Sequence, residues 1–234
     1  MRAFILAAGH GTRLKPLTDR IPKCLVPIRG TPLLGIWLEL CKRHGITDVL
    51  INIHSHAGQV REYLAAQQHP VRVHVSEETQ LLGSAGTLKS NAGWVGSEPF
   101  WVFYGDVLTT VDLGAIQRFH REHRQVATLG IKGVPDPKRC GIVEIDPGNI
   151  IQSFVEKPAH PASNLAFAGL ILAEPNFLDF IQGEWPLDIG FHVLPALGGR
   201  MAGYRITDYL IDVGTAENYQ TAQTSWPGMK EPNI

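Results

Sequence analysis

The chain has 234 residues, of which 44% are hydrophobic and 18% charged, and its formal net charge at pH 7 is −1. This composition is typical of a folded globular protein, and the absence of a dominant basic stripe argues against a general nucleic-acid binder. No apolar stretch approaches the ~20 residues of a membrane span, and the short N-terminal apolar run leads into a glycine loop rather than a signal peptide. We therefore expect a cytoplasmic protein that binds neither nucleic acid nor membranes. The three cysteines show no framework spacing and are expected to be reduced thiols.

Apolar runs and helical patterns alternate through the first half, which is typical of a mainly parallel α/β sheet. The expected strands cover residues 2–8, 49–53, 71–75 and 100–104. Helices are expected from a Thr31-Pro32 start to a Gly45 stop, over 59–68, from Gly83 through Trp94, and from Asp112 to about His123.

The second half is less regular, with short apolar runs separated by proline-rich turns. Strands are expected near residues 126–131, 141–145, 150–155 and 167–172, followed by a last strand before Asp212 and a terminal helix after Thr215. The predicted fold is an α/β, Rossmann-like three-layer sandwich around a mostly parallel mixed central sheet, without a C-terminal β-helix. Residues 227–234 are expected to form a loose tail.

The first strand breaks into a glycine loop, Gly9-His10-Gly11-Thr12-Arg13. Glycines let backbone N–H groups approach a phosphate, and arginine supplies charge-assisted donors. A dinucleotide fingerprint would need a third glycine where this chain has Leu14. A Walker A loop would end in Gly-Lys-Ser/Thr, whereas Lys15 lies between Leu14 and Pro16. The loop therefore predicts a phosphate site of another kind.

Two aspartates, Asp106 and Asp212, each follow an apolar strand. Open α/β sheets bind ligands at the carboxyl ends of their strands, and Gly105 and Gly214 would allow close approach to a ligand there. The alternative for Asp106 is an ordinary strand-end turn residue. Paired carboxylates at one edge suit Mg²⁺, which takes carboxylate oxygens together with waters and substrate phosphates.

Five segments together resemble the signatures of the sugar-1-phosphate nucleotidylyltransferase family. They are Leu6 to Thr18, Pro22-Lys23-Cys24-Leu25-Val26-Pro27, Gly105-Asp106-Val107, Glu156-Lys157-Pro158 and Asp212-Val213-Gly214-Thr215. The resemblance extends from Leu6 to Tyr219 and implies Mg²⁺-dependent, in-line transfer of a nucleotidyl group from a nucleoside triphosphate to a sugar-1-phosphate, with release of pyrophosphate. The form of Leu82-Gly83-Ser84-Ala85-Gly86-Thr87-Leu88 is most similar to guanylyltransferases of the mannose- or heptose-1-phosphate type, which favours GTP.

The resemblance also implies individual roles. The implied catalytic residues are Arg13, Lys23, Asp106 and Asp212, the two aspartates being the Mg²⁺ ligands. The implied nucleotide contacts are Leu6, Ala8, Gly9, Gly11, Thr12, Arg13, Lys23, Glu77, Gly83, Gly86 and Thr87. The implied sugar-phosphate contacts are Gly141, Glu156, Lys157, Asn164 and Gly169, with Glu156 accepting from sugar hydroxyls and Lys157 holding the phosphate. Many relatives have Asn-Ala-Gly where this chain has Phe167-Ala168-Gly169.

The glycines of the loop that follows Leu82 have two interpretations. A helix entry built from small residues can offer backbone N–H groups to a base edge or an anion, and it can equally be a close-packed helix start. We expect a single domain over residues 1–226, with a nucleotide-binding half over about 1–125 and a sugar-phosphate-binding half over about 126–226.

Other activities remain open at this point. The alternatives are a uridylyl-, thymidylyl- or cytidylyltransferase of the same fold, acting on another sugar-1-phosphate or on phosphocholine, and a non-catalytic subunit that senses a nucleotide-sugar. Such a sensor would be marked by degraded metal or lysine positions, whereas Lys23, Asp106 and Asp212 are all present. The sequence allows a homodimer and does not require one.

Overall fold

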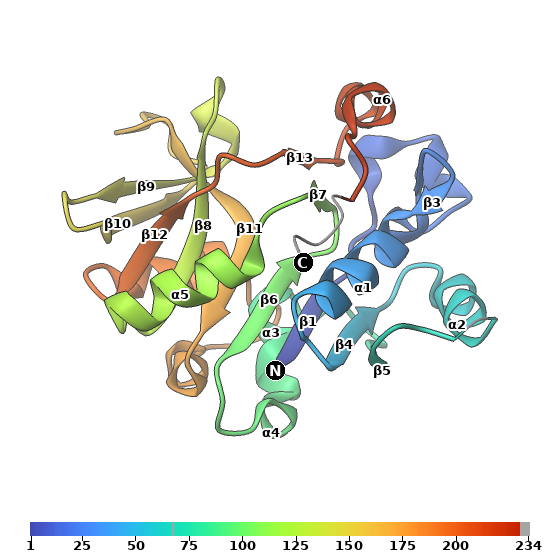
Figure 1. Ribbon diagram of the computed structural model, residues 1–234, viewed down its shortest axis with the longest axis horizontal. Coiled ribbons are helices and arrows are strands. Elements are labelled where there is room, and N and C mark those ends of the chain that lie inside the picture. Colours follow the sequence, from blue (N-terminus) through green and yellow to red (C-terminus); the bar gives the residue numbers. More distant parts are fainter. Residues whose placement is uncertain (67, 230–234) are drawn as a thin grey trace. The chain divides into compact units, whose positions relative to one another are not determined.

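The computed structural model describes residues 1–66 and 68–229 of an α/β protein, which divides into two compact units (Figure 1). Unit 1 contains Met1–Leu81, Phe103–Asp112 and the chain from Asp208 onward, and unit 2 contains Leu82–Val102 and Leu113–Thr207. The chain thus enters unit 2 well before the expected boundary near residue 125. The two units are defined by their compactness, whereas the two expected halves are defined by the substrate that each would bind. The nucleotide-binding and sugar-phosphate-binding halves therefore stay a prediction. Residues 230–234 of the expected tail lie outside the described residues.

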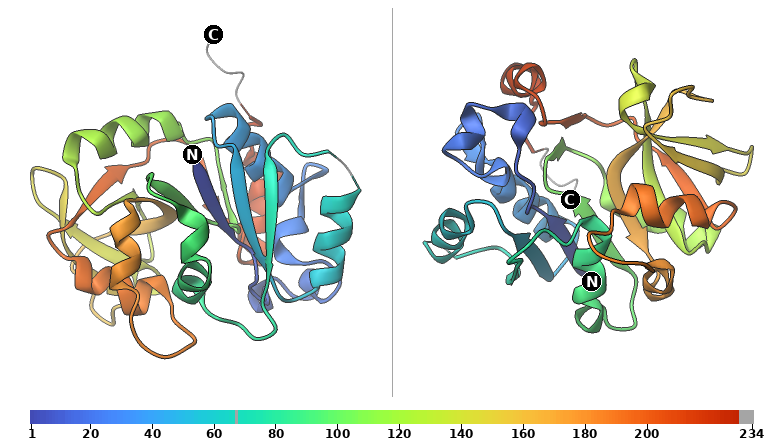
Figure 2. Two further views of the ribbon diagram at one scale, coloured as in Figure 1. Left: turned by 90° about the horizontal axis from the view of Figure 1, so that it is seen from below. Right: turned by 180° about the vertical axis from the view of Figure 1, so that it is seen from behind.

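Unit 1 is built on parallel strands. Strand β4 (Asp48–Ile53) lies between β1 (Arg2–Leu6) and β5 (Arg72–Glu77) and is parallel to both (Figure 2). Strand β6 (Phe100–Tyr104) begins in unit 2 and ends in unit 1. All four strands were expected from the sequence, and the parallel arrangement of the first three is confirmed. Parallel strands end at the same edge of a sheet, so the loops that follow them gather there.

The described residues of unit 1 form three α-helices: α1 (Leu33–Arg43), α2 (Ala57–Ala65) and α6 (Ala216–Ser225). The apolar face of α1 is buried, and its Trp37 ring stacks on Phe103 at 4.6 Å between centroids. The expected stop at Gly45 is confirmed, since Gly45 takes a left-handed φ of +70° after the helix. The expected start was one residue early, because Pro32 is the N-cap and Leu33 the first helical residue. Strands β2 (Pro27–Ile28) and β3 (Thr31–Pro32) pair as a small ribbon, and the helix begins only after it.

A pair of short strands, β7 (Val107–Thr109) and β13 (Leu210–Asp212), joins two distant parts of unit 1. The strands are antiparallel, with Val107 opposite Asp212, and the Val213 N–H donates to the Asp106 carbonyl at 2.8 Å. Strand β7 was not expected from the sequence. It nevertheless matters for the candidate site, because its pairing with β13 brings Asp106 and Asp212 to one place. Short 3-10 turns occupy Thr12–Leu14, Leu17–Asp19 and Lys23–Leu25 of the same unit.

Unit 2 holds a mainly antiparallel group of strands. Its strands are β8 (Ala127–Gly133), β9 (Gly141–Ile145), β10 (Ile150–Glu156), β11 (Leu165–Ala173) and β12 (Met201–Arg205). Their spatial order is β11-β8-β12-β10-β9, and β12 is parallel to β8 whereas the pairs β11–β8, β10–β12 and β10–β9 are antiparallel. The expectation of a mostly parallel sheet is therefore wrong for this unit, in which β8 and β12 are the parallel pair. Of the antiparallel pairs, β9 and β10 are joined directly by the short turn between Ile145 and Ile150. Strand β12 was not expected from the sequence.

The helices of unit 2 are α3 (Ser84–Ser90), α4 (Ala92–Val95) and α5 (Leu113–His123). The single helix expected from Gly83 through Trp94 is thus two helices, which are separated at Asn91. Helical turns also occupy Pro137–Arg139, Pro175–Phe180, Ile189–Val193 and Leu194–Leu197. None of the helices within 1–66 and 68–229 is long and apolar enough to cross a membrane.

A buried histidine in unit 2 should make folding pH-dependent. His120 is 2% exposed, its Nδ1 lies 2.8 Å from Thr128 Oγ1, and burial lowers its pKa below the usual 6.5 although Glu174 opposes the shift. The unfolded chain therefore takes up this proton first, and the stability contributed by neutral His120 is present above pH 6.5 and lost as the pH falls. In denaturant titrations from pH 7.5 to 5, we expect the unfolding free energy to fall less steeply for His120→Gln than for the wild type. Equal slopes would contradict this.

Candidate active site

The phosphate loop of unit 1 is held open by its neighbours. Its first N–H, that of Ala7, donates to Asn52 Oδ1 at 2.7 Å, and Gly11 has a φ of +63°. The Gly11 carbonyl accepts from the Leu14 N–H at 2.9 Å and from the Thr18 hydroxyl at 2.7 Å, which fixes the loop's curvature. Within the described part of the chain, the backbone N–H groups of residues 9–13 have no protein acceptor. Successive free N–H groups in such a loop form an anion-binding concavity.

A buried polar pair behind the loop was missed by sequence reasoning. The Asn52 side-chain amide donates to Glu78 Oε1 at 2.8 Å, and both residues are 4% exposed. Asn52 thus joins a buried carboxylate to the first N–H of the phosphate loop. The available signal was a single polar residue in the apolar run Val49-Leu50-Ile51-Asn52-Ile53. A polar side chain in a buried strand needs a partner, and this one positions the loop.

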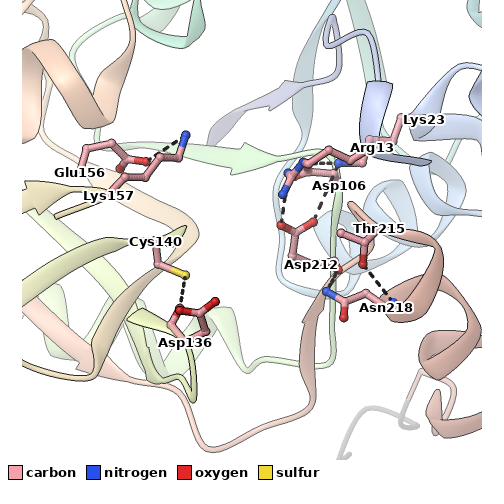
Figure 3. A network of polar contacts seen from close by, with 10 residues as sticks. All are labelled: Arg13, Lys23, Asp106, Asp136, Cys140, Glu156, Lys157, Asp212, Thr215 and Asn218. Atoms are coloured by element: carbon pink, nitrogen blue, oxygen red, sulfur yellow. Dashed lines mark hydrogen bonds and ion pairs between the residues drawn. The ribbon is translucent and has the colours of Figure 1, made fainter. Parts of the chain in front are cut away.

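The predicted catalytic residues form one cluster in unit 1 (Figure 3). Lys23 Nζ lies 2.5 Å from Asp106 Oδ2 and 3.9 Å from Asp212 Oδ1, and Arg13 Nη2 lies 3.9 Å from Asp212 Oδ2. The Lys23 side chain is 12% exposed, whereas that of Arg13 is 64% exposed. The structure therefore brings together four residues from four separate segments.

Charge in this cluster is balanced between two cations and two carboxylates. Burial raises the pKa of Asp212 above its ordinary value, and the nearby Asp106 carboxylate raises it further, although Lys23 and Arg13 oppose this. The two carboxylates consequently favour an additional cation. Asp106 lines a pocket of about 230 Å³, and Asp212 lies next to it in the cluster without being part of the lining. The pocket is lined by Leu6, Ala7, Gly9, Gly11, Thr12, Arg13, Lys23, Cys24, Gly105, Asp106 and Gly214.

The two aspartates of the cluster, together with the phosphate loop, fit a magnesium ion bound together with phosphate. Within 1–66 and 68–229, no group of three or more His, Cys, Asp or Glu side chains could hold a metal ion by itself. Magnesium commonly uses one or two carboxylates and completes its octahedron with waters and substrate phosphates. Asp106 and Asp212, beside a loop with free N–H groups, match that donor set.

Two predicted nucleotide contacts of unit 1 lie outside the pocket lining. Ala8 is 5% exposed and lies two residues after the end of β1. Glu77 is the last residue of β5, and its carboxylate forms a surface ion pair with Arg61. The structure gives Glu77 a partner other than a ligand, and a contact of either residue with the nucleotide stays a prediction.

The loop before α3, in unit 2, is a close-packed helix start. The Leu187 carbonyl accepts from the N–H groups of Ala85 at 2.9 Å and Gly86 at 3.1 Å. A Cβ on Gly83 would lie 2.3 Å from that carbonyl oxygen, and Thr87 is fully buried with its hydroxyl donating to the Gly83 carbonyl. The suggestion that this helix entry offers its N–H groups to a base or anion is therefore wrong for the two that bind Leu187. Contacts of Gly83, Gly86 and Thr87 with a nucleobase stay predictions.

The predicted sugar-phosphate residues lie in unit 2. Glu156 ends β10, and Lys157 follows it with a φ of +49° and places its Nζ 3.7 Å from Glu156 Oε1 (Figure 3). Burial raises the pKa of Glu156, and the nearby Asp188 raises it further, although Lys157 opposes this. A Cβ on Gly141 would lie 2.6 Å from Glu156 Oε2. Gly141, Glu156 and Lys157 thus form a compact group.

The other two predicted sugar-side residues have structural explanations of their own. Gly169 has a φ of +77° where the pairing of β11 with β8 changes register, and this irregularity favours glycine. Asn164 is exposed just before β11, and its carbonyl accepts from the Val134 N–H at 2.9 Å. Neither observation tests a contact with a sugar, so both contacts stay predictions.

The cysteines should differ sharply in reactivity. Cys24 and Cys41 are buried, and burial raises the pKa of Cys24 to about 12 and also raises that of Cys41. Cys140 is partly exposed. The thiolate is the reactive form, so we expect a thiol reagent at pH 8 to modify one cysteine rapidly in the native protein and all three in denaturant. Peptide mapping should identify the first as Cys140. Rapid labelling of Cys24 in the native state would contradict the structure.

Parallel strands, a glycine loop and a carboxylate–lysine cluster at the strand ends are features of α/β proteins that bind phosphorylated ligands. Residues 2–226 match the family model described as Nucleotidyl transferase. The chain belongs to this family. It is 32% identical to mannose-1-phosphate guanylyltransferase catalytic subunit beta of Drosophila pseudoobscura pseudoobscura over 94% of its own length, and 32% identical to a UTP–glucose-1-phosphate uridylyltransferase of Synechocystis sp. over 95%. It spans 61% and 62% of these relatives, respectively.

Solved structures share the fold. A putative glucose-1-phosphate thymidylyltransferase from Bacillus anthracis superposes with a TM-score of 0.89 at 24% identity, covering 99% of this chain and 97% of that one. HddC from Yersinia pseudotuberculosis, in complex with GMP-PN, gives a TM-score of 0.81 at 24% identity, covering 96% and 99%. At this level of identity, the likeness concerns the fold alone.

Proposed function

We propose that this protein transfers a nucleotidyl group from a nucleoside triphosphate to a sugar-1-phosphate, releasing pyrophosphate. The observation that carries the proposal is the position of Lys23, whose ammonium group lies at Asp106 beside a loop of free N–H groups. Family membership and relatives named as guanylyl- and uridylyltransferases support the reaction class.

The chemistry needs alignment and charge neutralisation more than proton transfer. A sugar-phosphate oxygen, already ionised at neutral pH, forms a bond to the α-phosphorus while the bond to the β-phosphate oxygen breaks, and pyrophosphate leaves. The N–H groups of residues 9–13 would bind the triphosphate, and Arg13 would stabilise charge on the leaving group. Lys23 would contact the phosphates between which the nucleotidyl group moves.

Asp106 and Asp212 would hold Mg²⁺. The two cations of the cluster are already matched by these two carboxylates, so the side chains offer no excess positive charge to a triphosphate. A bound Mg²⁺ would supply that charge and orient the phosphate oxygens. On the sugar side, Glu156 would accept from ring hydroxyls, and the exposed Lys157 ammonium would bind the sugar phosphate.

We propose GTP and a mannose- or heptose-type 1-phosphate as the preferred substrates, because the Leu82–Leu88 form resembles that of guanylyltransferases. A second candidate is UTP with glucose-1-phosphate. It is favoured by the Synechocystis uridylyltransferase, which is as similar in sequence as the guanylyltransferase.

The test is pyrophosphate release from each of GTP, UTP, CTP and dTTP with mannose-, glucose- and heptose-1-phosphates and with phosphocholine, in Mg²⁺ or in EDTA. We expect release that requires both substrates and Mg²⁺ and is fastest with GTP. Faster release with UTP and glucose-1-phosphate would replace the substrate assignment. No release from any pair, together with binding of a nucleotide-sugar, would overturn the enzyme and favour a sensor.

A further inference from the structure

The segment from Trp185 to Phe191 in unit 2 connects the loop before α3 to Glu156, and no sequence motif pointed to it. Besides accepting two N–H groups of α3 at its carbonyl, Leu187 donates its own N–H to the Leu82 carbonyl at 2.9 Å. The Trp185 ring covers Gly86, where an added Cβ would lie 2.7 Å from ring carbons. The segment is therefore fixed to the loop by backbone hydrogen bonds and by packing.

Asp188 holds the next part of the segment in place. Its Oδ2 accepts from the Ser84 hydroxyl at 2.8 Å, and its Oδ1 accepts from the Phe191 N–H at 3.1 Å. Ser84 Oγ in turn accepts from the Ile189 N–H at 2.7 Å. These bonds fix the backbone on both sides of Gly190.

Gly190 faces the Glu156 carboxylate. A Cβ built on Gly190 would lie 2.6 Å from Glu156 Oε2 and 3.1 Å from Glu156 Cδ. The same Oε2 would lie 2.6 Å from a Cβ on Gly141. The carboxylate therefore fits between two glycine backbones, which we call the glycine slot (Gly141 and Gly190). Only 15% of the Glu156 side chain is exposed, so the slot leaves it little freedom.

We propose that Gly190 is a positioning residue of the sugar site. With Gly141 it forms the slot that fixes the Glu156 carboxylate, while Asp188 and Ser84 hold this wall of the slot in place. The inference rests on the proposed function, in which Glu156 accepts from sugar hydroxyls. A fixed acceptor discriminates between sugars whose hydroxyls point in different directions, so the slot would contribute to sugar selectivity.

The substitution Gly190→Ala tests whether Gly190 positions the Glu156 carboxylate, because it adds a methyl group where the carboxylate lies. The nearest atom is the end of a flexible side chain, so the fold should tolerate the methyl group while the carboxylate moves. We expect the KM for the sugar-1-phosphate to rise ~10-fold or more, as on weakening a hydrogen bond to a charged group. The KM for the nucleotide and kcat should stay within ~2-fold. Gly133→Ala is the matched control, because a Cβ there would meet nothing within 4 Å.

Testing Gly190→Ala in a variant that already carries Glu156→Asp shows whether Gly190 acts by positioning the Glu156 carboxylate or by a general effect on the structure. Glu156→Asp withdraws the carboxylate by one methylene, so adding Gly190→Ala should change the KM by less than ~2-fold in that background. An equal fold-change in both backgrounds, or an unchanged KM in Gly190→Ala alone, would overturn the proposal.

The slot can also be tested if the proposed function fails. Should the wild type turn over no sugar-1-phosphate, the side-chain carboxyl resonance of Glu156 in ¹³C-glutamate-labelled protein, assigned with Glu156→Gln, reports on the slot directly. We expect this resonance to move in Gly190→Ala and not in Gly133→Ala. An unmoved resonance in Gly190→Ala would overturn the slot whatever the reaction proves to be.

Discussion

Replacing Lys23 by alanine is expected to lower kcat by ~10²–10³-fold, the usual loss when one electrostatic contact to the reacting groups is removed. Lys23 Nζ lies 2.5 Å from Asp106 and 3.9 Å from Asp212, at the pocket lined by the phosphate loop. The ammonium group would neutralise charge that grows as pyrophosphate departs, so the effect should appear in kcat and in kcat/KM alike.

Steady-state kinetics with both substrates varied would measure this loss. Lys42→Ala is a suitable control, because Lys42 is an exposed lysine on α1 of the same unit. Lys23 is mostly buried, so circular dichroism and a denaturant midpoint should accompany the kinetics to show that the variant is folded. A folded Lys23→Ala protein with the kcat of the wild type would exclude Lys23 from the chemistry.

Some regular elements could be predicted because their patterns are strong over short stretches. Phe100-Trp101-Val102-Phe103 is wholly apolar, and it is the buried strand β6 with the bounds that were expected. By contrast, β7 has three residues and no pattern of its own. It exists because Val107–Thr109 finds a partner a hundred residues away in Leu210–Asp212, and such a pairing cannot be seen in a local window.

The residues of the candidate site also differ in how far they could be predicted from the sequence. Lys23, Asp106 and Asp212 were expected from their motifs, and the structure places them in one cluster. For Gly83 and Gly86 the sequence allowed either a ligand contact or a close-packed helix start, and the structure shows the Trp185–Leu187 segment packed on them, a contact between distant parts of the sequence, while the ligand contact stays a prediction. A motif indicates that a position requires a particular residue type. It does not indicate whether a ligand or the packing of the chain imposes that requirement, and the packing can be seen only in the fold.

The substitution Asp106→Asn should separate two tasks of the Asp106 carboxylate, which are to bind Mg²⁺ and to hold Lys23 in an ion pair. The amide has the shape of the carboxylate but lacks its charge, so Mg²⁺ binding should weaken and Lys23 should lose its ion pair. We expect kcat to fall by ~10²–10³-fold and the Mg²⁺ concentration that gives half-maximal activity to rise. Titrating Mg²⁺ at saturating substrate measures both quantities. Asp112→Asn, six residues further along the chain and outside the pocket lining, is the matched control.

The double variant Lys23→Ala, Asp106→Asn adds a test of how the pair works. The two side chains are in contact, so their losses should not multiply, and the double variant should be less impaired than the product of the single losses. If the fold-losses in kcat did multiply, so that the corresponding free energies were additive, each residue would act on the substrates separately. A reduced kcat in Asp106→Asn with an unchanged Mg²⁺ requirement would remove Asp106 as a metal ligand and leave it the task of orienting Lys23.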